Sequence, residues 1–80
     1  MNGMEKLNYK AQDRERILSF IASQGGVASV IDIMEKSGAE RLRVYPILME
    51  EKLAGRLTYV EEEEYGSPKV VRIVTPHRKE

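Results

Sequence analysis

The first third of the chain distributes apolar and polar residues with the period of a helix. Four apolar side chains gather on one side of that helix: Ile17, Leu18, Phe20 and Ile21. This spacing predicts an amphipathic helix over about residues 10–24. Gly25 and Gly26 follow directly, and glycine adopts the positive φ of a helix C-cap without steric cost. We therefore expect the first helix to end there and the chain to change direction.

A second, shorter helix is predicted to start at Ser29. The segment S-V-I-D at residues 29–32 reads as a capping box, in which the serine oxygen accepts a free backbone N–H and the acid reaches back. The helix stops near Gly38, and a third helix is predicted over about residues 40–54, with Gly55 as its stop. The short connection between them has the spacing of a helix-turn-helix.

The third helix carries two apolar faces. At 100° per residue, Val44, Ile47 and Leu48 fall on nearly the opposite side from a second apolar set. That second set is Leu42, Tyr45, Pro46, Met49 and Leu53. One face packs on the first two helices, and the other must be covered by the hairpin, a partner chain or a ligand. Because proline removes a helical hydrogen bond, we expect a kink at Pro46 or a helix that begins only near Tyr45.

After Gly55 the apolar period changes to two, which predicts a β-hairpin with its turn at residues 65–68. With the turn centred between Gly66 and Ser67, the opposed residues are Glu64 with Lys69 and Glu61 with Arg72. The same register assigns the sheet faces, with Leu57, Tyr59 and Val74 on one and Val60, Val71 and Ile73 on the other. The oppositely charged pairs help to fix that register.

Length and composition fit one small soluble domain. The chain has 80 residues, of which 41% are hydrophobic and 32% charged. We place the domain at residues 9–75, with residues 1–8 and 76–80 as flexible or dimer-contacting tails. Neither a long apolar run nor a signal-peptide pattern is present, so we expect a cytoplasmic protein. Because the chain has no cysteine, no disulfide can stabilise its small core. We therefore expect dimerisation to supply that stabilisation.

The net charge of the chain does not indicate a class of partner, because thirteen basic residues balance thirteen acidic ones. Its distribution is uneven: residues 36–56 have a modest excess of basic side chains, whereas residues 61–64 are four consecutive glutamates. His77 is the only histidine and has no second ligand at metal spacing. No acid–base pair in the sequence implies catalysis. We expect neither an enzyme nor a cofactor or metal site.

The order of helix, short helix, turn, longer helix and hairpin resembles the winged-helix family, the helix-turn-helix variant with a β-hairpin wing. The resemblance covers about residues 13–74. It is carried by E-R-I-L-S-F-I, by K-S-G-A in the turn, by V-Y-P-I-L in the third helix, and by A-G-R-L and Y-G-S-P-K-V-V around the hairpin. It implies an α+β fold of three helices followed by a two-stranded wing.

In that family the third helix usually lies in the DNA major groove. The resemblance therefore implies a small DNA-binding protein, a transcriptional regulator that contacts duplex DNA with the start of its third helix. The positions that match the family's contact sites are Lys36, Glu40, Arg41, Arg43 and Lys69. Because arginine binds guanine edges or phosphates through its forked donors, we expect Arg41 and Arg43 to project outward together.

Three features depart from the family's pattern. Glu51 stands where an apolar residue is common, so we expect a shift in core packing. Pro46 stands where a polar, groove-facing side chain is common, and it offers neither donor nor charge. Glu61 to Glu64 make the wing acidic, and because DNA is itself strongly anionic, we do not expect the wing to enter the minor groove.

A second function stays open from the sequence, that of a protein-interaction module. Its contact surface would be the acidic hairpin and the second apolar face of the third helix, and the net charge of zero favours it. Homodimerisation is expected from the thin core, from that same apolar face and from the N-terminal residues Met4, Leu7 and Tyr9. A winged helix serves either function, because function belongs to the site rather than to the scaffold.

Overall fold

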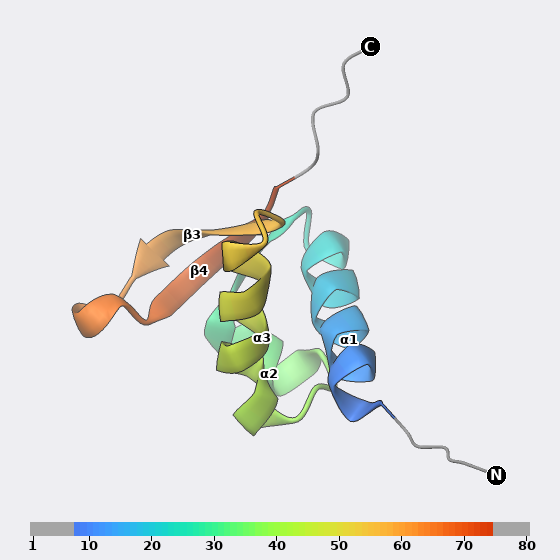
Figure 1. Cartoon of the computed structure of the whole chain (residues 1–80). Coiled ribbons are helices and arrows are strands. Elements are labelled where there is room, and N and C mark those ends of the chain that lie inside the picture. Colours follow the sequence, from blue (N-terminus) through green and yellow to red (C-terminus); the bar gives the residue numbers. More distant parts are fainter. Residues whose placement is uncertain (1–7, 75–80) are drawn as a thin grey trace, which may run out of the picture.

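The computed structural model of the chain describes residues 8–74 (Figure 1). The helices are α1 (Tyr9–Ser23), α2 (Val30–Lys36) and α3 (Arg41–Leu53), and the strands are β2 (Val27–Ser29), β3 (Leu57–Glu62) and β4 (Pro68–Ile73), with a 3-10 turn η1 (Glu64–Gly66) at the tip of the β3–β4 hairpin. The tails expected at residues 1–8 and 76–80, with Met4, Leu7 and His77, lie outside the described residues except for residue 8. No helix within residues 8–74 is long and apolar enough to cross a membrane.

Local sequence sets the ends of the helices as predicted. α1 ends before Gly25, which has a φ of +85°. At the start of α2 the Ser29 hydroxyl accepts the backbone N–H of Asp32 at 3.1 Å, which is one half of the predicted capping box. Gly38, with a φ of +88°, turns the chain into α3, and Gly55, with a φ of +82°, follows its end. Each of these glycines occupies a conformation that a side chain would strain.

The sheet has one strand more than predicted. β2 pairs antiparallel with β4, with Ala28 opposite Val71, and the strand order is β2-β4-β3. Three residues are too few to show an alternating pattern, so this strand forms only because β4 supplies a partner backbone. Its pairing joins the connection between α1 and α2 to the base of the wing (Figure 1).

The predicted register of the hairpin is wrong. The observed opposite pairs are Leu57–Ile73, Thr58–Arg72, Tyr59–Val71, Glu61–Val70 and Glu62–Pro68. Within these strands the predicted pairs Glu61–Arg72 and Glu64–Lys69 are therefore absent. The turn is longer than the prediction assumed, because residues 64–66 fold into η1 at its tip. The register also shifts beyond Tyr59, where β3 carries an irregularity.

The core lies between the helices and the sheet. Its buried apolar residues are Ile17, Ile21, Ala28, Val30, Ile33, Ala39, Val44, Ile47, Leu48, Leu57 and Val71. Leu57 and Val71 were predicted on opposite faces of the hairpin, but the observed register places both on the core side. The sheet therefore buries one face against the helices, as a half-solvated antiparallel sheet does.

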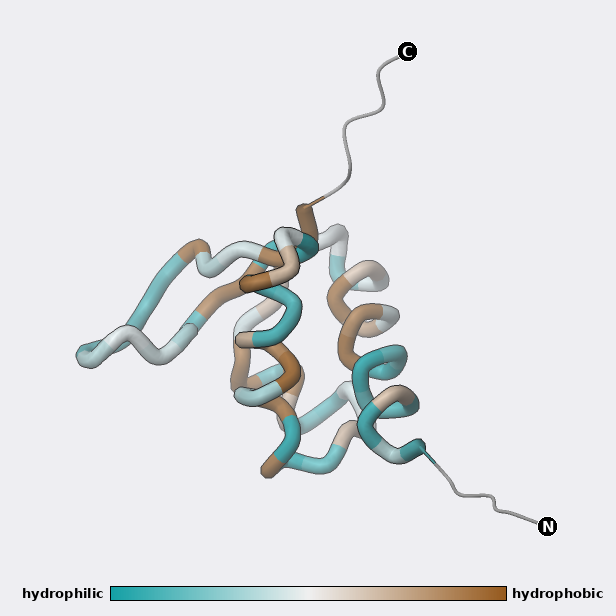
Figure 2. Tube along the Cα trace, in the orientation of Figure 1, coloured by the Kyte–Doolittle hydropathy of each residue, from teal (hydrophilic) through white to brown (hydrophobic). Residues whose placement is uncertain are grey.

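α3 runs from Arg41 through Pro46 to Leu53, so the alternative of a helix that begins near Tyr45 is wrong. Of the two predicted apolar faces, the one with Val44, Ile47 and Leu48 packs on the core. The opposite face is exposed, and we call its four large side chains the apolar stripe: Leu42, Tyr45, Met49 and Leu53. Brown segments recur along α3 in Figure 2, because it has apolar residues on both faces.

Glu51 occupies a core position and is only 1% exposed. Its carboxylate accepts hydrogen bonds from Nε and Nη2 of Arg56 at 2.7 and 3.1 Å, and Nε of Arg14 lies 3.5 Å away. Hydrogen bonding from Arg56 is the main reason that the pKa of Glu51 lies below its ordinary value, against the opposing effect of burial. The core accommodates the acid at this position because two arginines neutralise it.

Candidate functional site

A buried carboxylate organises the positive charge around the start of α3. Asp13 on α1 is 2% exposed. Its two oxygens accept hydrogen bonds from Nη1 of Arg16 at 2.8 Å, from Nη1 of Arg43 at 2.7 Å and from the backbone N–H of Glu40 at 3.2 Å. Burial raises the pKa of Asp13, but these donors outweigh it, so the pKa lies below its ordinary value. The carboxylate is therefore charged at neutral pH and ties α1 to the first turn of α3.

A hollow of about 600 Å³ opens between α1 and the start of α3, and we call it the arginine cleft. It is lined by Tyr9, Asp13, Arg16, Gly38, Ala39, Glu40, Arg41 and Arg43. Three guanidinium groups stand against two carboxylates in this lining, so its net charge is positive. The backbone N–H groups of the first turn of α3 add partial positive charge. The cleft is therefore suited to an anionic ligand such as a phosphate.

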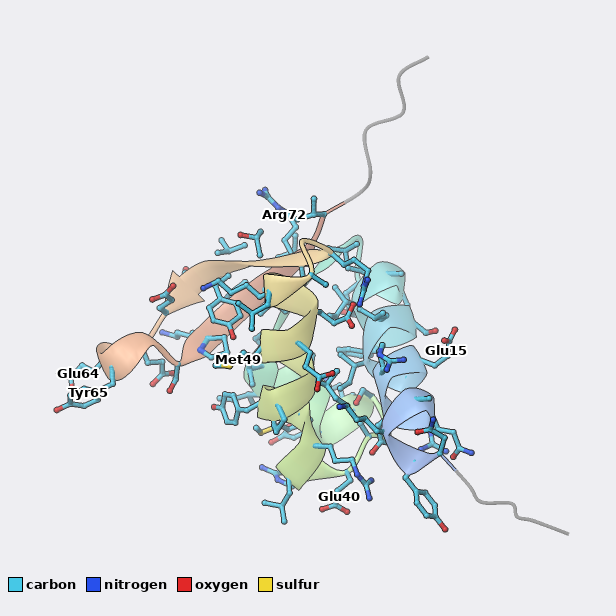
Figure 3. The ribbon with its side chains drawn as sticks, viewed as in Figure 1. Glu15, Glu40, Met49, Glu64, Tyr65 and Arg72 are labelled. Carbon is cyan, nitrogen blue, oxygen red and sulfur yellow. The ribbon has the colours of Figure 1, made fainter. Side chains whose placement is uncertain are left out.

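Four of the five predicted contact residues lie around this cleft. Glu40, Arg41 and Arg43 line it, and Lys36 lines a neighbouring hollow with Arg16. Glu40 marks the start of α3 in Figure 3. Lys69 is separate from this group: it lies on β4 and lines a different pocket, formed with α2 and Tyr45. The structure thus brings together the helix residues of the predicted site but not its wing residue.

Arg41 and Arg43 do not project outward together, which corrects the arrangement expected from the sequence. Arg43 turns toward α1, where it pairs with Asp13 and where its guanidinium carbon lies 5.5 Å from the ring centroid of Tyr9. Arg41 is exposed, and among residues 8–74 no carboxylate forms an ion pair with it. Arg41 is thus available to a ligand, whereas Arg43 has a large part of its charge compensated within the fold.

The sequence prediction missed Asp13 and Arg16. Asp13 precedes Ile17 and Ile21 at intervals of four residues. That spacing places an acid on the buried face of α1, and a buried acid requires a cationic or hydrogen-bonding partner. The same periodicity therefore contained a signal for the polar cluster, but it could not name Arg43 as the partner.

The wing carries the opposite charge from the cleft. Glu61 to Glu64 are all exposed, and Figure 2 shows this part of β3 and the hairpin tip as hydrophilic. Within residues 8–74 these four glutamates form no ion pair. In the same part of the chain, no three His, Cys, Asp or Glu side chains are grouped as metal ligands would be.

No family model matches the chain, and no curated protein matches it in sequence. Among solved structures, a similar arrangement is found in the crystal structure of the Zalpha domain from Carassius auratus PKZ in complex with Z-DNA. The match has a TM-score of 0.62 at 18% sequence identity and covers 81% of this chain and 97% of that one. The chain has the winged-helix fold. In this winged helix, α2 and α3 form the helix-turn-helix and the β3–β4 hairpin forms the wing, so the predicted α+β fold is confirmed.

Proposed function

We propose that this winged-helix domain binds duplex DNA through the arginine cleft. The observation that carries the proposal is a concave, net positive site at the start of α3 in which Arg41 is exposed and makes no ion pair within residues 8–74. The similar solved domain is in complex with Z-DNA, which supports DNA as the class of ligand. Phosphate oxygens match both the forked donors of arginine and the first-turn N–H groups of a helix.

The residues around the cleft have different roles in the proposed binding. Arg41 reaches a phosphate or a guanine edge, since it is both exposed and at the first position of α3. Arg16 and Lys36, which both line the neighbouring hollow, contact phosphates of the backbone. Arg43 positions the first turn through Asp13, and Glu40, exposed at the N-cap of α3, accepts a hydrogen bond from a cytosine amino group.

The acidic wing limits how the duplex approaches. Glu61 to Glu64 repel phosphates, so the duplex docks from the side of α1 and the start of α3, away from the wing. With two or three phosphates neutralised, the logarithm of affinity falls against the logarithm of salt concentration with a slope of about −2 to −3. Specific binding of this kind at an operator is how the domain acts as a transcriptional regulator.

A fluorescence titration with labelled duplexes tests the proposal. Two duplexes are used, one of mixed sequence and one of alternating dC and dG held left-handed by bromination of its bases. Both carry the phosphate charge that the cleft binds, and the ratio of their affinities reports how far the protein reads helix shape. We expect binding to both at about 50 mM salt, with the slope given above.

The decisive variant is Arg41→Ala, which removes the exposed guanidinium. It should weaken binding by about five- to tenfold and reduce the salt slope by about one. Arg72→Ala is the matched control, because Arg72 is an exposed arginine on β4 at the opposite end of the view from Glu40 (Figure 3). Undetectable binding at low salt, or an equal loss in both variants, would contradict the proposal.

A further inference from the structure

α3 exposes a second surface that the proposed DNA contact does not use. The four side chains of the apolar stripe have exposed fractions of 84% for Leu42, 45% for Tyr45, 55% for Met49 and 80% for Leu53. They follow one another at intervals of three or four residues, so they form a line along one side of the helix. A contiguous line of large apolar side chains in water is typical of an interaction surface.

The wing borders this stripe. Lys52 of α3 places its ammonium 4.4 Å from the ring centroid of Tyr59 on β3, which joins the second half of the helix to the wing. Burial, and then the charge of Glu62 on the same strand, raise the pKa of Tyr59 above its ordinary value. Met49 projects from α3 on the side of the wing (Figure 3).

A small pocket connects the stripe with the acidic tip of the wing. Its volume is about 110 Å³, and its lining includes Tyr45 from the stripe, Ile31 and Met34 from α2, and Glu63 from the tip. Ile31 is itself 65% exposed and so extends the apolar surface from α3 onto α2. The surface thus combines an apolar line with carboxylates along one border.

We propose that the apolar stripe and Glu61 to Glu64 together bind a basic amphipathic helix of a partner protein. The apolar face of that helix packs on the stripe, and its lysine or arginine side chains pair with the wing. Charge complementarity carries the choice of partner, because the four wing carboxylates are exposed and form no ion pair within residues 8–74. The mode is that of a helix laid in an apolar groove, with charges fixing its orientation.

Two other occupants fit this surface less well. A symmetric pairing of stripe on stripe between two copies brings both acidic wings to one interface, where like charges repel. DNA is repelled by the same carboxylates. The inference does not rest on the proposed DNA contact, since Arg16, Lys36 and Arg41 take no part in it.

An idealised Leu–Lys amphipathic helix of about four turns is the probe, and a Leu–Glu helix of the same pattern is its control. The full chain carries ¹³C-methyl methionine, so that the methyl resonance of Met49 reports contact with the stripe. We expect saturable binding of the Leu–Lys helix with a shift of the Met49 methyl, and no binding of the Leu–Glu helix. Binding of both peptides, or a Met49 methyl that does not move, would overturn the proposal.

Three variants separate the apolar and the charged contributions. Met49→Glu, and the pair Glu62→Lys with Glu63→Lys, should each weaken binding of the Leu–Lys helix by about tenfold or more. All three positions are exposed, so the variants should fold, which circular dichroism confirms. Glu15→Lys is the matched charge control, since Glu15 lies on α1 away from the wing (Figure 3), and it should leave binding unchanged.

Three outcomes would overturn the assignment of the stripe to a basic helix. An equal loss of peptide binding in Glu15→Lys would show that the Leu–Lys helix responds only to the net charge of the protein. Sedimentation of the unliganded chain as a dimer that Met49→Glu dissociates would assign the stripe to a second copy of the chain. A loss of duplex binding in Met49→Glu would assign it to the DNA interface.

Discussion

Arg43 reaches from α3 to place its Nη1 atom 2.7 Å from Oδ2 of the buried Asp13 on α1. The pair joins positions thirty residues apart in sequence and fixes the first turn of α3 against the first helix. Because the carboxylate is shielded from water, it depends on its protein donors for compensation of its charge. Arg43 therefore shapes the arginine cleft, while Arg41 is left to a ligand.

Asp13→Asn should lower the free energy of unfolding by about 1–3 kcal/mol. The neutral amide weakens the hydrogen bonds from Arg16 and Arg43, and its own NH₂ group is buried among hydrogen-bond donors rather than acceptors. Urea unfolding at neutral pH measures the change. Glu15→Gln, an exposed acid on the same helix, should change stability by less than about 0.5 kcal/mol. Equal stability of Asp13→Asn and the parent chain would contradict the role given to Asp13.

Acid should destabilise the protein through Glu51 and Asp13. Their folded-state pKa values lie below the ordinary values of 4.5 and 3.8, so the unfolded chain binds protons first as the pH falls. The stabilisation is complete above these ordinary values and is lost as the pH falls toward the lower values of the folded state. Unfolding free energies should therefore be level near neutral pH and should decrease below about pH 5.

Glu51→Leu isolates the share of Glu51 in this pH dependence. Leucine fills the core position without a charge, and the freed Arg56 and Arg14 side chains are partly solvated. We expect a free energy of unfolding within about 1 kcal/mol of the parent chain at neutral pH, because replacing a buried ion pair by an apolar residue often changes stability little. The decrease in stability on acidification should be smaller than in the parent. An unchanged decrease would show that Glu51 does not contribute.

Pro46→Ala should raise the free energy of unfolding by about 1–3 kcal/mol. Proline inside α3 leaves the carbonyl of Leu42 without its helical donor, and alanine restores that hydrogen bond. The gain is reduced because alanine also gives the unfolded chain more freedom. Urea unfolding measures the difference, with Leu42→Ala, at an 84% exposed position of the same helix, as a control that lacks any backbone effect. A destabilised Pro46→Ala would mean that the proline ring makes contacts worth more than the missing bond.

Tyr65 has a φ of +69° at the wing tip and is 98% exposed. A left-handed backbone costs a bulky residue about 1–2 kcal/mol, and asparagine tolerates it better. Tyr65→Asn should therefore raise the free energy of unfolding by about 0.5–1 kcal/mol. Tyr65→Ala keeps the strain and loses no packing, so its stability should match that of the parent chain. Thermal unfolding of the three proteins gives the comparison, and equal values for all three would rule out strain at this residue.

The helices and their ends were predictable because the signals that set them are local. Gly25, Ser29 and Gly38 each act within a few residues of their own position. The two faces of α3 likewise followed from the helical period, and the structure buries Val44 while it exposes Met49. The winged-helix arrangement followed from the order of these elements.

The register of the hairpin could not be predicted in the same way. It depends on the conformation of the tip, where Tyr65 takes a positive φ that its residue type disfavours. β2 was missed because its pairing with β4 joins segments more than forty residues apart. In the candidate site, the helical pattern predicted that Lys36 ends one helix and that Glu40 and Arg41 begin the next, but pairing of Arg43 with Asp13 is a tertiary contact that no local pattern specifies.

The measurement that tests the central claim most directly is a map of backbone amide chemical shifts during titration with duplex DNA at low salt. If the arginine cleft is the DNA site, the shifts should concentrate at Arg16 and at residues 36–43, and in Arg41→Ala the same shifts should need about five- to tenfold more duplex. Shifts confined to residues 57–72, or no shifts at duplex concentrations that saturate other winged-helix domains, would contradict the account.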